Sequence, residues 1–555
     1  MLFHKSGVIL LEIDCEVLDN CNVHFQKVAY IFKEEVRMKK VGKTLNLLLV
    51  LVLVLSLVGC GSTKTGNNQQ SASSAGSITK EADLVVVGGG GAGLSAAIEA
   101  ASQGKKVIML EKQSILGGNT NFAEGIFAVD SPIQKQMGIT TDKMHILREE
   151  LEFGNYHQDA LLWNQVINDS AANIQWLLDM GMKFHTVASL GAGEKTWHLY
   201  EGMGKALVKD VLAPKAEKLG VDIMLNTPGK EIIMDNEVVS GVKASNKEGK
   251  DVIIKAKAVI LATGGFADDK EMVKTLAKVD PSRIVFRGAP GHDGDGIKMA
   301  QKVGATSNGW GMLAMLAPTL QGTSITSHMG AAATIEPNNL WVNNDGLRFV
   351  NEDVIFEMTR ASNAFLTQSK TFSVMDSSMM NKRIADGCVL GVGAYVPPGT
   401  KLVKLNEEIQ KALDAKDPNV FKADTLDELA TKMGVNKENF LATVNKYNGY
   451  AASGADTEFG KNPMFITPIK TGPFYAFNLK LNGLNTMGGI KVNTKSEVLN
   501  AKQEPIKGLY AAGMDCDGYT GDTYGLVIPG SDQGIAVFTG RDSAINAVKY
   551  ISTLN

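Results

Sequence analysis

A glycine-rich stretch between residues 82 and 112, ADLVVVGGGGAGLSAAIEAASQGKKVIMLEK, constrains the fold of this chain more than any other feature. The apolar and mostly β-branched run Leu84–Val87 is typical of a strand that is buried on both faces of a parallel sheet. Directly after it, Gly88, Gly90 and Gly93 have the spacing Gly-x-Gly-x-x-Gly. In a strand–turn–helix unit, the first glycine turns the chain, the second lets a pyrophosphate approach, and the third lets the helix pack on the strand. The stretch therefore predicts a dinucleotide site.

The residues after the glycines supply the rest of this unit. A helix predicted over Leu94–Ser102 would point its N-terminal amides at the bound anion. A second strand is predicted over Val107–Leu110, and Glu111 at its end can accept hydrogen bonds from ribose hydroxyls. The alternative is a glycine-rich turn in an ordinary βαβ unit, for which strand, helix, second strand and terminal acid need not occur in this order.

Length and composition exclude several classes of protein. With 555 residues the chain is too long for one simple core, so two or more domains are expected. Its 56 basic and 59 acidic residues leave a net charge of −3, which gives no electrostatic reason to expect a nucleic-acid partner. Cys15, Cys21, Cys60, Cys388 and Cys516 are too scattered for a disulfide framework or a haem or metal motif. We therefore expect no bound metal.

The N-terminal region predicts export. Residues 1–37 have no counterpart later in the chain, and we interpret them as a non-native upstream extension before a start at Met38. Basic residues followed by an apolar run too short to span a bilayer comfortably predict a signal peptide over 38–60. This segment ends in Leu-Val-Gly-Cys, which resembles the lipobox of bacterial lipoproteins, so we expect cleavage before Cys60 and lipid on its sulfur. The alternative is an uncleaved membrane anchor.

A tether is predicted between this signal and the folded part. Residues 61–77, GSTKTGNNQQSASSAGS, are small and polar and lack apolar periodicity, as in a flexible linker. The folded part is expected to begin near Ile78. We therefore expect an exported protein that is lipid-anchored through Cys60 to the outer face of the bacterial cytoplasmic membrane.

Four further motifs resemble those of one flavoprotein family. They are Gly-Gly-Asn-Thr at 117–120 with Ala-Glu-Gly at 123–125, Ala-Thr-Gly-Gly at 262–265, Gly-Asp-Gly at 294–296 and Gly-Leu-Tyr-Ala-Ala-Gly at 508–513. In this order they resemble the fumarate reductase, urocanate reductase and 3-ketosteroid dehydrogenase flavoproteins, and the resemblance extends from about Ile78 to the C-terminus. It implies that the cofactor is FAD.

The resemblance also implies an α/β fold class, with a Rossmann-type FAD-binding domain and an inserted α+β capping domain. It places the first part of the FAD-binding domain at 78–316, the capping domain at 317–484 and the rest of the FAD-binding domain at 485–555. The substrate would lie in the cleft between the two domains, where closure expels water. The residues expected to hold FAD are Gly88, Gly90, Gly91, Ala92, Gly93, Glu111, Lys112, Gly118, Asn119, Thr120, Ala123, Gly125, Ala262, Thr263, Gly264, Asp295, Gly513, Met514, Ser531, Gly534 and Ile535.

The substrate positions depart from those of the fumarate-reducing members. Those members hold two carboxylates with histidines, a Thr-Glu pair and an arginine. At the corresponding places this chain has Ala317, the pair at 331–332 (Ala-Ala), Asn485 and Tyr524. A dicarboxylate without cationic partners would be buried with uncompensated charge, at a cost of several kcal/mol per ion. Fumarate is therefore not an expected substrate.

Tyr524 is the first catalytic candidate. Followed by Pro-Gly-Ser at 529–531, it resembles the Thr-Tyr-Pro-Gly of 3-ketosteroid dehydrogenases with residues 525–528 inserted. The resemblance implies a phenol that polarises a substrate carbonyl or delivers a proton, and Asp522 is expected to orient it. The alternative is a packed aromatic residue near the flavin.

Arg360 is the second catalytic candidate. The reductases take their proton from an arginine shortly after Asn-Glu, and here Arg360 follows Glu352 by eight residues. An arginine acts as an acid only through a carboxylate relay, which Glu352 and Glu357 could supply. The alternative is a solvated surface arginine.

These observations predict an FAD-dependent oxidoreductase that reduces a C=C bond conjugated to a carbonyl or carboxylate, by hydride transfer from flavin N5. The expected substrate is a small unsaturated carbonyl compound or aryl acrylate. The electrons would come from a separate membrane or flavin-bearing donor, because no haem, iron–sulfur or second flavin motif is visible. The alternatives are a 3-ketosteroid-type dehydrogenase and a non-catalytic flavin lipoprotein that carries electrons.

Overall fold

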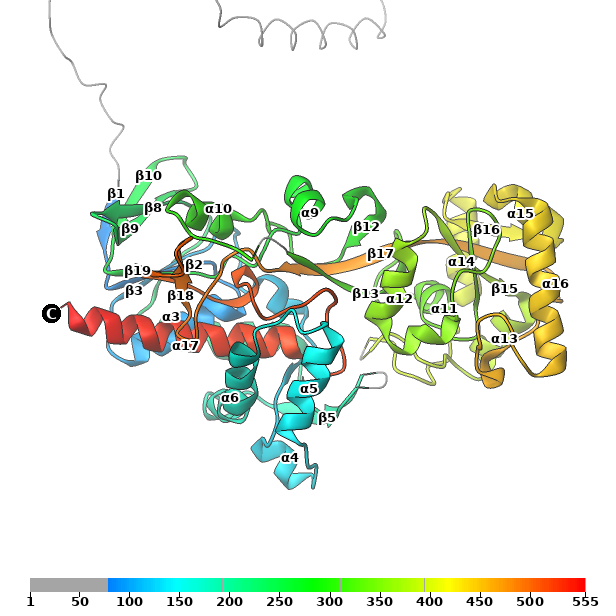
Figure 1. Cartoon of the computed structure of the whole chain (residues 1–555), viewed down its shortest axis with the longest axis horizontal. Helices are drawn as coiled ribbons and strands as arrows, with labels where there is room; N and C mark the ends of the chain where they lie inside the picture. The colour runs from blue at the N-terminus through cyan, green and yellow to red at the C-terminus, as the bar shows by residue number, and fades with distance from the viewer. Residues whose placement is uncertain (1–77, 191–192, 309–310, 394, 555) are drawn as a thin grey trace, which may run out of the picture. The chain divides into compact units, whose positions relative to one another are not determined.

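The computed structural model describes residues 78–190, 193–308, 311–393 and 395–554 (Figure 1). Ser74–Asn555 form one compact unit. The predicted extension, signal peptide and tether lie outside the described residues. Within the described ranges, no helix is both long enough and apolar enough to cross a membrane.

The central element is a six-stranded sheet that is parallel except for its first strand. In spatial order its strands are β18 (Glu497–Leu499), β19 (Pro505–Ala511), β11 (Ala258–Leu261), β2 (Leu84–Val87), β3 (Val107–Leu110) and β7 (Asp222–Met224). Strand β18 runs antiparallel to β19, and the other neighbours are parallel. The two strands predicted on either side of the glycine turn and its helix begin and end at the predicted residues. The mixed α/β fold class is also confirmed.

Successive side chains of these strands point to opposite faces of the sheet, and apolar side chains are buried on both faces. Val85 and Val87 belong to one hydrophobic cluster, whereas Leu84 and Val86 belong to another. The second cluster also contains apolar residues of helices α3 (Gly91–Ser102) and α17 (Ser531–Thr553), which pack together. Burial of each valine or leucine contributes roughly 1.5–3 kcal/mol, and a slip by one residue would exchange the two faces. The register is therefore strongly specified.

Two smaller sheets and several helices complete this part of the chain. The four-stranded sheet contains β1 (Ile78–Glu81), β10 (Asp251–Lys255), β9 (Val238–Ser245) and β8 (Gly229–Asp235), and the three-stranded sheet contains β4 (Gly125–Phe127), β6 (Trp197–Tyr200) and β5 (Phe184–Ala188). The helices are α4 (Pro132–Gln136), α5 (Lys143–Phe153), α6 (Ala160–Asp179), α7 (Met203–Ala206), α8 (Ala213–Lys218), α9 (Lys270–Leu276) and α10 (Asp295–Lys302).

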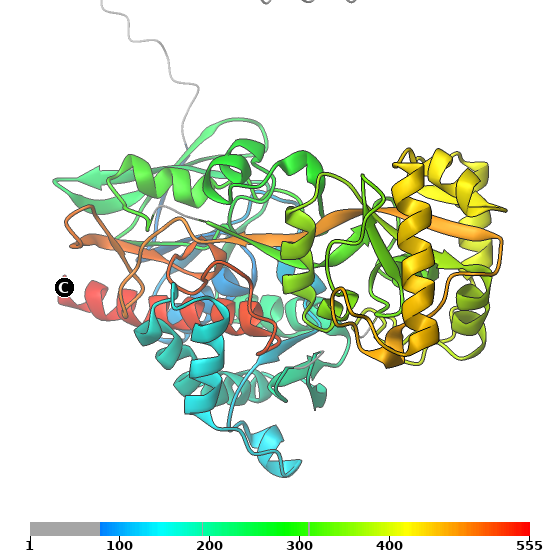
Figure 2. The same ribbon diagram turned by 45° about the vertical axis from the view of Figure 1, so that its right-hand side comes forward.

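The region predicted as the capping domain has its own sheet and core. The sheet is formed by β12 (Ile284–Phe286), β17 (Phe474–Met487), β15 (Thr371–Asp376) and β14 (Leu340–Asn343), and β13 (Met312–Leu320) and β16 (Val420–Ala423) also pair with β17. Its helices are α11 (His328–Thr334), α12 (Met358–Leu366), α13 (Ser377–Ala385), α14 (Leu405–Asp414), α15 (Leu426–Met433) and α16 (Lys437–Ser453). The long helix α16, yellow in Figure 2, contributes Phe440, Val444 and Tyr447 to this core.

The two predicted domain boundaries fall inside strands. Position 317 lies within β13 and position 484 lies within β17, and these two strands are antiparallel neighbours. Strand β17 pairs with β15 and β16 through its first half and with β12 and β13 through its second half. The chain therefore enters and leaves the capping region through paired strands.

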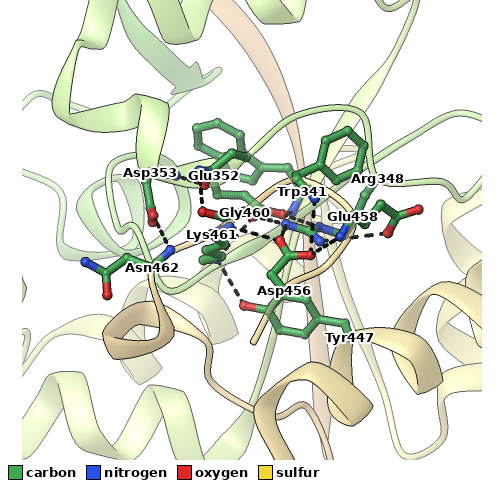
Figure 3. A network of polar contacts seen from close by, with 12 residues as sticks. Trp341, Arg348, Glu352, Asp353, Tyr447, Asp456, Glu458, Gly460, Lys461 and Asn462 are labelled. Carbon is green, nitrogen blue, oxygen red and sulfur yellow. Dashed lines mark hydrogen bonds and ion pairs between the residues drawn. The ribbon is translucent and has the colours of Figure 1, made fainter. Parts of the chain in front are cut away.

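A buried charge network holds two segments of the capping region together (Figure 3). Arg348 binds Glu352 at 2.8 Å and Asp456 at 3.0 Å, and Lys461 lies 3.2 Å from Glu352. All four side chains are at most 2% exposed. Burial by itself raises the pKa of Asp456, but hydrogen bonds from Arg348 and from backbone amides lower it to about 2. The network therefore consists of compensated charges and has a structural role.

Candidate functional site

A pocket of about 300 Å³ lies at the carboxyl ends of β2, β3 and β11, where an open α/β sheet binds its ligands. The helix α3 begins at this pocket. The predicted cofactor residues that line it are Gly88, Gly90, Gly91, Ala92, Glu111, Lys112, Gly118, Asn119, Thr120, Ala262, Thr263, Gly264, Asp295, Gly513 and Met514. The pocket therefore brings residues of the glycine turn together with residues of the motifs at 117–120, 262–265, 294–296 and 508–513.

The other predicted cofactor residues are not among the lining residues, and several instead serve packing. They are Gly93, Ala123, Gly125, Ser531, Gly534 and Ile535. A Cβ on Gly125 would lie 2.3 Å from the carbonyl oxygen of His198, and one on Gly534 would lie 3.2 Å from Phe127. Their small size is explained by neighbouring protein atoms. For these positions cofactor contact remains a prediction.

The three glycines of the turn have different surroundings. A Cβ on Gly88 would lie 2.1 Å from the Ala262 carbonyl oxygen, and one on Gly93 would lie 1.9 Å from the Gly88 carbonyl oxygen. At Gly90 the nearest atom would be the Gly117 carbonyl oxygen at 3.8 Å. Gly88 and Gly93 are therefore required by the fold, whereas Gly90 keeps open the space next to the helix N-terminus. This is the space that a pyrophosphate needs.

Glu111 retains capacity for a ribose. Its carboxylate accepts hydrogen bonds from the amides of Gly89 at 2.8 Å and Gln113 at 2.7 Å. Burial raises its pKa, and the two amides oppose this effect. Each carboxylate oxygen has a further lone pair, so a ribose hydroxyl can still donate to it. The residues of the pocket thus fit FAD, with an anion site at α3 and an acceptor at the end of β3.

Asp515 binds the turn at 262–265, next to the pocket, and the sequence analysis did not identify it. Its buried carboxylate accepts hydrogen bonds from the Thr263 amide at 2.6 Å and the Gly265 amide at 2.9 Å. It also accepts one from the Thr263 hydroxyl. The available signal was an acidic residue two positions after the last glycine of the motif at 508–513.

Replacing Gly90 with alanine should separate cofactor binding from folding. Gly90 has φ −77°, which alanine adopts freely, so the apoprotein should keep its stability within about 1 kcal/mol. FAD affinity should fall at least about tenfold, or ~1.4 kcal/mol, because the methyl group occupies the space for the pyrophosphate. Isothermal titration of apoprotein with FAD measures the affinity, and urea unfolding measures the stability.

Gly93→Ala is the matched variant. Its methyl group meets backbone, so it should destabilise the apoprotein itself. Equal FAD affinity in Gly90→Ala and the wild type would contradict the assignment of the pocket.

A second group of residues borders the pocket, and we call Tyr524, Asp532, Asn485 and Glu150 the Tyr524 cluster. The Tyr524 side chain interacts with the Asp532 carboxyl group and with Ser531, and Asn485 donates to Asp532 at 3.1 Å. Tyr524 is 7% exposed. Within the described residues, buried oxygens of Asp532, Asn485 and Glu150 have no hydrogen-bond partner. The cluster therefore has unused polar atoms in an interior place.

Two hydrogen bonds join the Tyr524 cluster to the pocket. Asn119, which lines the pocket, donates to the carbonyl oxygen of Leu484 at 3.4 Å, next to Asn485 in the chain. Thr120, also in the lining, bonds to Gln533 at 3.0 Å, next to Asp532. Leu484 and Gln533, the chain neighbours of Asn485 and Asp532, therefore contact residues that line the pocket. Leu484 and Asn485 belong to β17.

Burial controls the protonation of the cluster. It raises the pKa of Asp532 to about 6, against 3.8 in an exposed aspartate. Burial also raises the pKa of Tyr524 well above its usual range, and the charge of Asp532 adds to this. Near neutral pH the phenol is therefore protonated, and it can donate a hydrogen bond.

The structure corrects the role predicted for Asp522. Its carboxylate pairs with His157 at 2.5 Å and accepts a hydrogen bond from Asn155, and its side chain is 45% exposed. The carboxylate that meets Tyr524 is Asp532. Tyr524 is turned into the interior, whereas Asp522 is at the surface, so proximity in sequence selected the wrong acid.

Arg360 lies at the junction between α12 and α5, with half of its side chain exposed. It pairs with Glu357 at 2.5 Å and lies over the ring of Phe153 at 4.4 Å. From the same helix, Asn363 donates to the hydroxyl of Thr523 at 2.8 Å, next to Tyr524. Glu352 belongs to the buried network with Arg348, so of the two carboxylates considered as relays only Glu357 is beside Arg360.

Histidines 185, 198 and 292 differ in their surroundings. His198 is buried in β6 and bonds to the Ser131 hydroxyl at 2.6 Å, and burial lowers its pKa to about 4. His185 is exposed on β5. His292 lines the pocket beside Gly264 and Gly118, and burial lowers its pKa as well.

The pH dependence of stability tests the burial of Asp532. The folded protein binds this proton more tightly than the unfolded chain, so the unfavourable effect is absent below about pH 4 and complete above about pH 7. A shift from 3.8 to about 6 corresponds to about 3 kcal/mol at most. Asp532→Asn should therefore gain stability relative to the wild type as the pH rises, which urea unfolding between about pH 4 and 8 measures. A difference that does not change with pH would show that Asp532 titrates as an exposed aspartate.

Comparisons with known proteins agree with this geometry. The family described as "FAD binding domain" matches residues 83–524. A vinyl phenol reductase from Lactiplantibacillus plantarum is 40% identical over 476 residues, which cover 84% of this chain and 96% of that protein. A fumarate reductase (cytochrome) from Shewanella frigidimarina is 31% identical over 479 residues, which cover 84% of this chain and 77% of that protein. A solved 3-ketosteroid-Δ4-(5α)-dehydrogenase from Rhodococcus jostii RHA1 has a TM-score of 0.66 at 26% identity, covering 86% of this chain and 99% of that one.

Proposed function

The chain belongs to the FAD binding domain family, and on that premise we propose that this FAD-dependent oxidoreductase reduces a C=C bond in a small unsaturated substrate. The double bond is conjugated to a carbonyl, a carboxylate or a phenol ring. The phenol is included because a vinyl phenol reductase is 40% identical over nearly its whole length. The sequence also lacks the cationic residues expected to bind a dicarboxylate, which favours the same class of substrate.

The observation that carries the proposal is the chemistry of the Tyr524 cluster. At two places where fumarate-reducing members are expected to hold cations, this chain has the phenol of Tyr524 and the amide of Asn485, and the carboxyl groups of Asp532 and Glu150 interact with this pair. The other two substrate positions are buried alanines, Ala317 and the pair at 331–332. A dianion beside these carboxyls would lose its hydration without gaining a counter-charge, at several kcal/mol per ion. A neutral aryl alkene avoids this cost, and a monoanionic one incurs it only once.

The residues of the cluster perform the proton half of the reduction. FAD supplies the hydride when bound. Tyr524 holds a proton on its phenolic oxygen and gives it to the carbon that does not receive the hydride, and Asp532 returns a proton to that oxygen. Asn485 fixes the Asp532 carboxyl by its hydrogen bond. Hydride and proton together convert the alkene to the saturated product.

Anaerobic oxidation of reduced methyl viologen tests the proposal. Purified FAD-loaded protein is offered 4-vinylphenol, an aryl acrylate, a neutral enone, urocanate, fumarate and a Δ4-3-ketosteroid. We expect turnover with an aryl alkene or enone and little with fumarate. Turnover of fumarate at about 10 per second or more, a typical rate for an evolved enzyme, would contradict the loss of the clamp.

A second candidate is dehydrogenation of a ketosteroid-type substrate. It is supported by the Tyr524 phenol before Pro-Gly at 529–530 and by the similarity to a solved ketosteroid dehydrogenase. The same purified protein would then reduce an artificial acceptor when a saturated 3-ketosteroid is added. Activity in this direction without alkene reduction would favour this candidate over the first.

We also propose that the protein is exported, anchored through lipid on Cys60, and reduced by a separate donor. The support is the Leu-Val-Gly-Cys motif after an apolar run and the lack of haem motifs in the sequence. Metabolic labelling with a radioactive fatty acid should mark the wild type and leave Cys60→Ser unlabelled. Equal labelling of both proteins would contradict the anchor.

A further inference from the structure

Glu150 is a buried carboxyl group that the proposed chemistry does not yet use. It lies on α5 and is 3% exposed, and Gln158 donates to its backbone carbonyl oxygen at 2.8 Å. A Cβ on Gly525 would lie 2.4 Å from its Oε2, so the carboxyl group lies against the backbone next to Tyr524. Within the described residues Oε2 has no hydrogen-bond partner. A buried polar atom of this kind is costly unless it has a use.

The Glu150 carboxyl group interacts with residues of two segments. In the C-terminal segment, the ionisable groups that interact with it are Tyr524 and Asp532. In its own segment, the buried Gln158 interacts with its carboxyl group. The preceding residue, His157, pairs with Asp522 at the surface.

The neighbouring helices complete this arrangement. Arg360 of α12, paired with Glu357, covers Phe153, three residues after Glu150. The segments at 150–158 and 521–525 pack directly on each other, because a Cβ on Gly521 would lie 2.1 Å from the Gly154 carbonyl oxygen. Glu150 is therefore held in place from both sides.

Resting on the function proposed above, we propose that Glu150 is the proton reservoir of the reduction, which reprotonates Tyr524 through Asp532 after each turnover. One proton leaves the Tyr524 oxygen for the product carbon, one passes from the Glu150 carboxyl group to the cluster, and one from water restores Glu150. Each turnover thus consumes one proton from solvent, and the hydride supplies both electrons.

Protonation energetics support this role. Burial raises the pKa of Glu150 well above its usual range, and the charge of Asp532 raises it further. Two interacting carboxyl groups in an interior cannot both ionise cheaply, so we expect the pair to retain a proton near neutral pH. Burial raises the pKa of Asp532 to about 6.

Glu150→Gln tests the reservoir because it keeps the volume of the side chain and removes the exchangeable acid. The infrared C=O band of a protonated carboxylic acid should be present in the wild type at neutral pH and weakened in the variant, whether or not the enzyme turns over. With an aryl alkene, kcat at pH 8 should fall roughly tenfold, while KM and kcat at pH 5 change less than about twofold. The reason is that above pH 6 the remaining acid, Asp532, is ionised.

Glu149→Gln is the matched control. Glu149 is the neighbouring residue on α5 and its side chain is 39% exposed beside His145, so this variant should keep the wild-type band and pH profile. An active wild type with an unchanged pH profile in Glu150→Gln would overturn the reservoir alone. A wild type that reduces none of the alkenes would overturn the proposed function, and the infrared band would still report the protonation of Glu150.

Discussion

Replacing Tyr524 with phenylalanine should lower kcat for the alkene by about 100-fold or more, with little change in KM. Tyr524 is 7% exposed and phenylalanine keeps its packing, so the variant loses only the phenolic oxygen that interacts with Asp532. The loss falls on kcat because the proton is transferred in the transition state. Steady-state oxidation of reduced methyl viologen measures both constants, and flavin absorbance confirms equal FAD content.

Asp522→Asn is the control for this variant. Asp522 was predicted to orient the tyrosine, but it pairs with His157 at the surface, so its replacement should change kcat less than about twofold. If Tyr524→Phe retains wild-type kcat, Tyr524 is a packed aromatic residue and the proton comes from elsewhere. Arg360 would then be the next residue to replace.

The strands around the glycine turn could be predicted from sequence because local pattern determines them. Leu84–Val87 and Val107–Leu110 are short apolar runs bounded by glycine and charged residues, and both occur as predicted. The helix begins at Gly91 rather than Leu94, since the glycines themselves form its first turn. The domain boundaries were harder to predict from the sequence, because the single strand β17 pairs with β15 through its first half and with β13 through its second half.

The candidate site was predictable where a motif carries it and not where distant residues meet. The pocket residues of the glycine turn and of 117–120 lie in continuous motifs. Asp515 bonds to Thr263, which lies 252 residues away in the sequence. Glu150 of α5 contacts Gly525, which is also distant in the sequence. No local pattern therefore marks either residue. Asp522, which the sequence predicts to orient Tyr524, lies at the surface, whereas Asp532 interacts with Tyr524. Burial and side-chain direction, which decide the pairing, appear only in the fold.

Lys461→Met should destabilise the protein by about 3–5 kcal/mol, because it breaks the buried charge network of the capping region. The Lys461 ammonium is fully buried and lies 3.2 Å from Glu352. It also donates to the carbonyl oxygen of Asn339 at 2.9 Å and to the hydroxyl of Tyr447 at 3.0 Å. Methionine fills the volume but leaves Glu352 with less compensation and two oxygens without their donor. Urea unfolding followed by tryptophan fluorescence measures the loss, since Trp341 donates from its amide to Glu352.

Lys446→Met is the matched control for this prediction, because it also removes a lysine from an ion pair in the capping region. Lys446 is 55% exposed and binds Glu458 at 2.9 Å, so its loss should cost at most about 1 kcal/mol. Adding Glu352→Gln to Lys461→Met should cost less than the sum of the single changes, because the glutamate then carries no uncompensated charge. Equal costs for Lys461→Met and Lys446→Met would mean that water reaches Glu352 and screens its charge. The network would then hold the loop at 454–461 through its hydrogen bonds rather than through its charges.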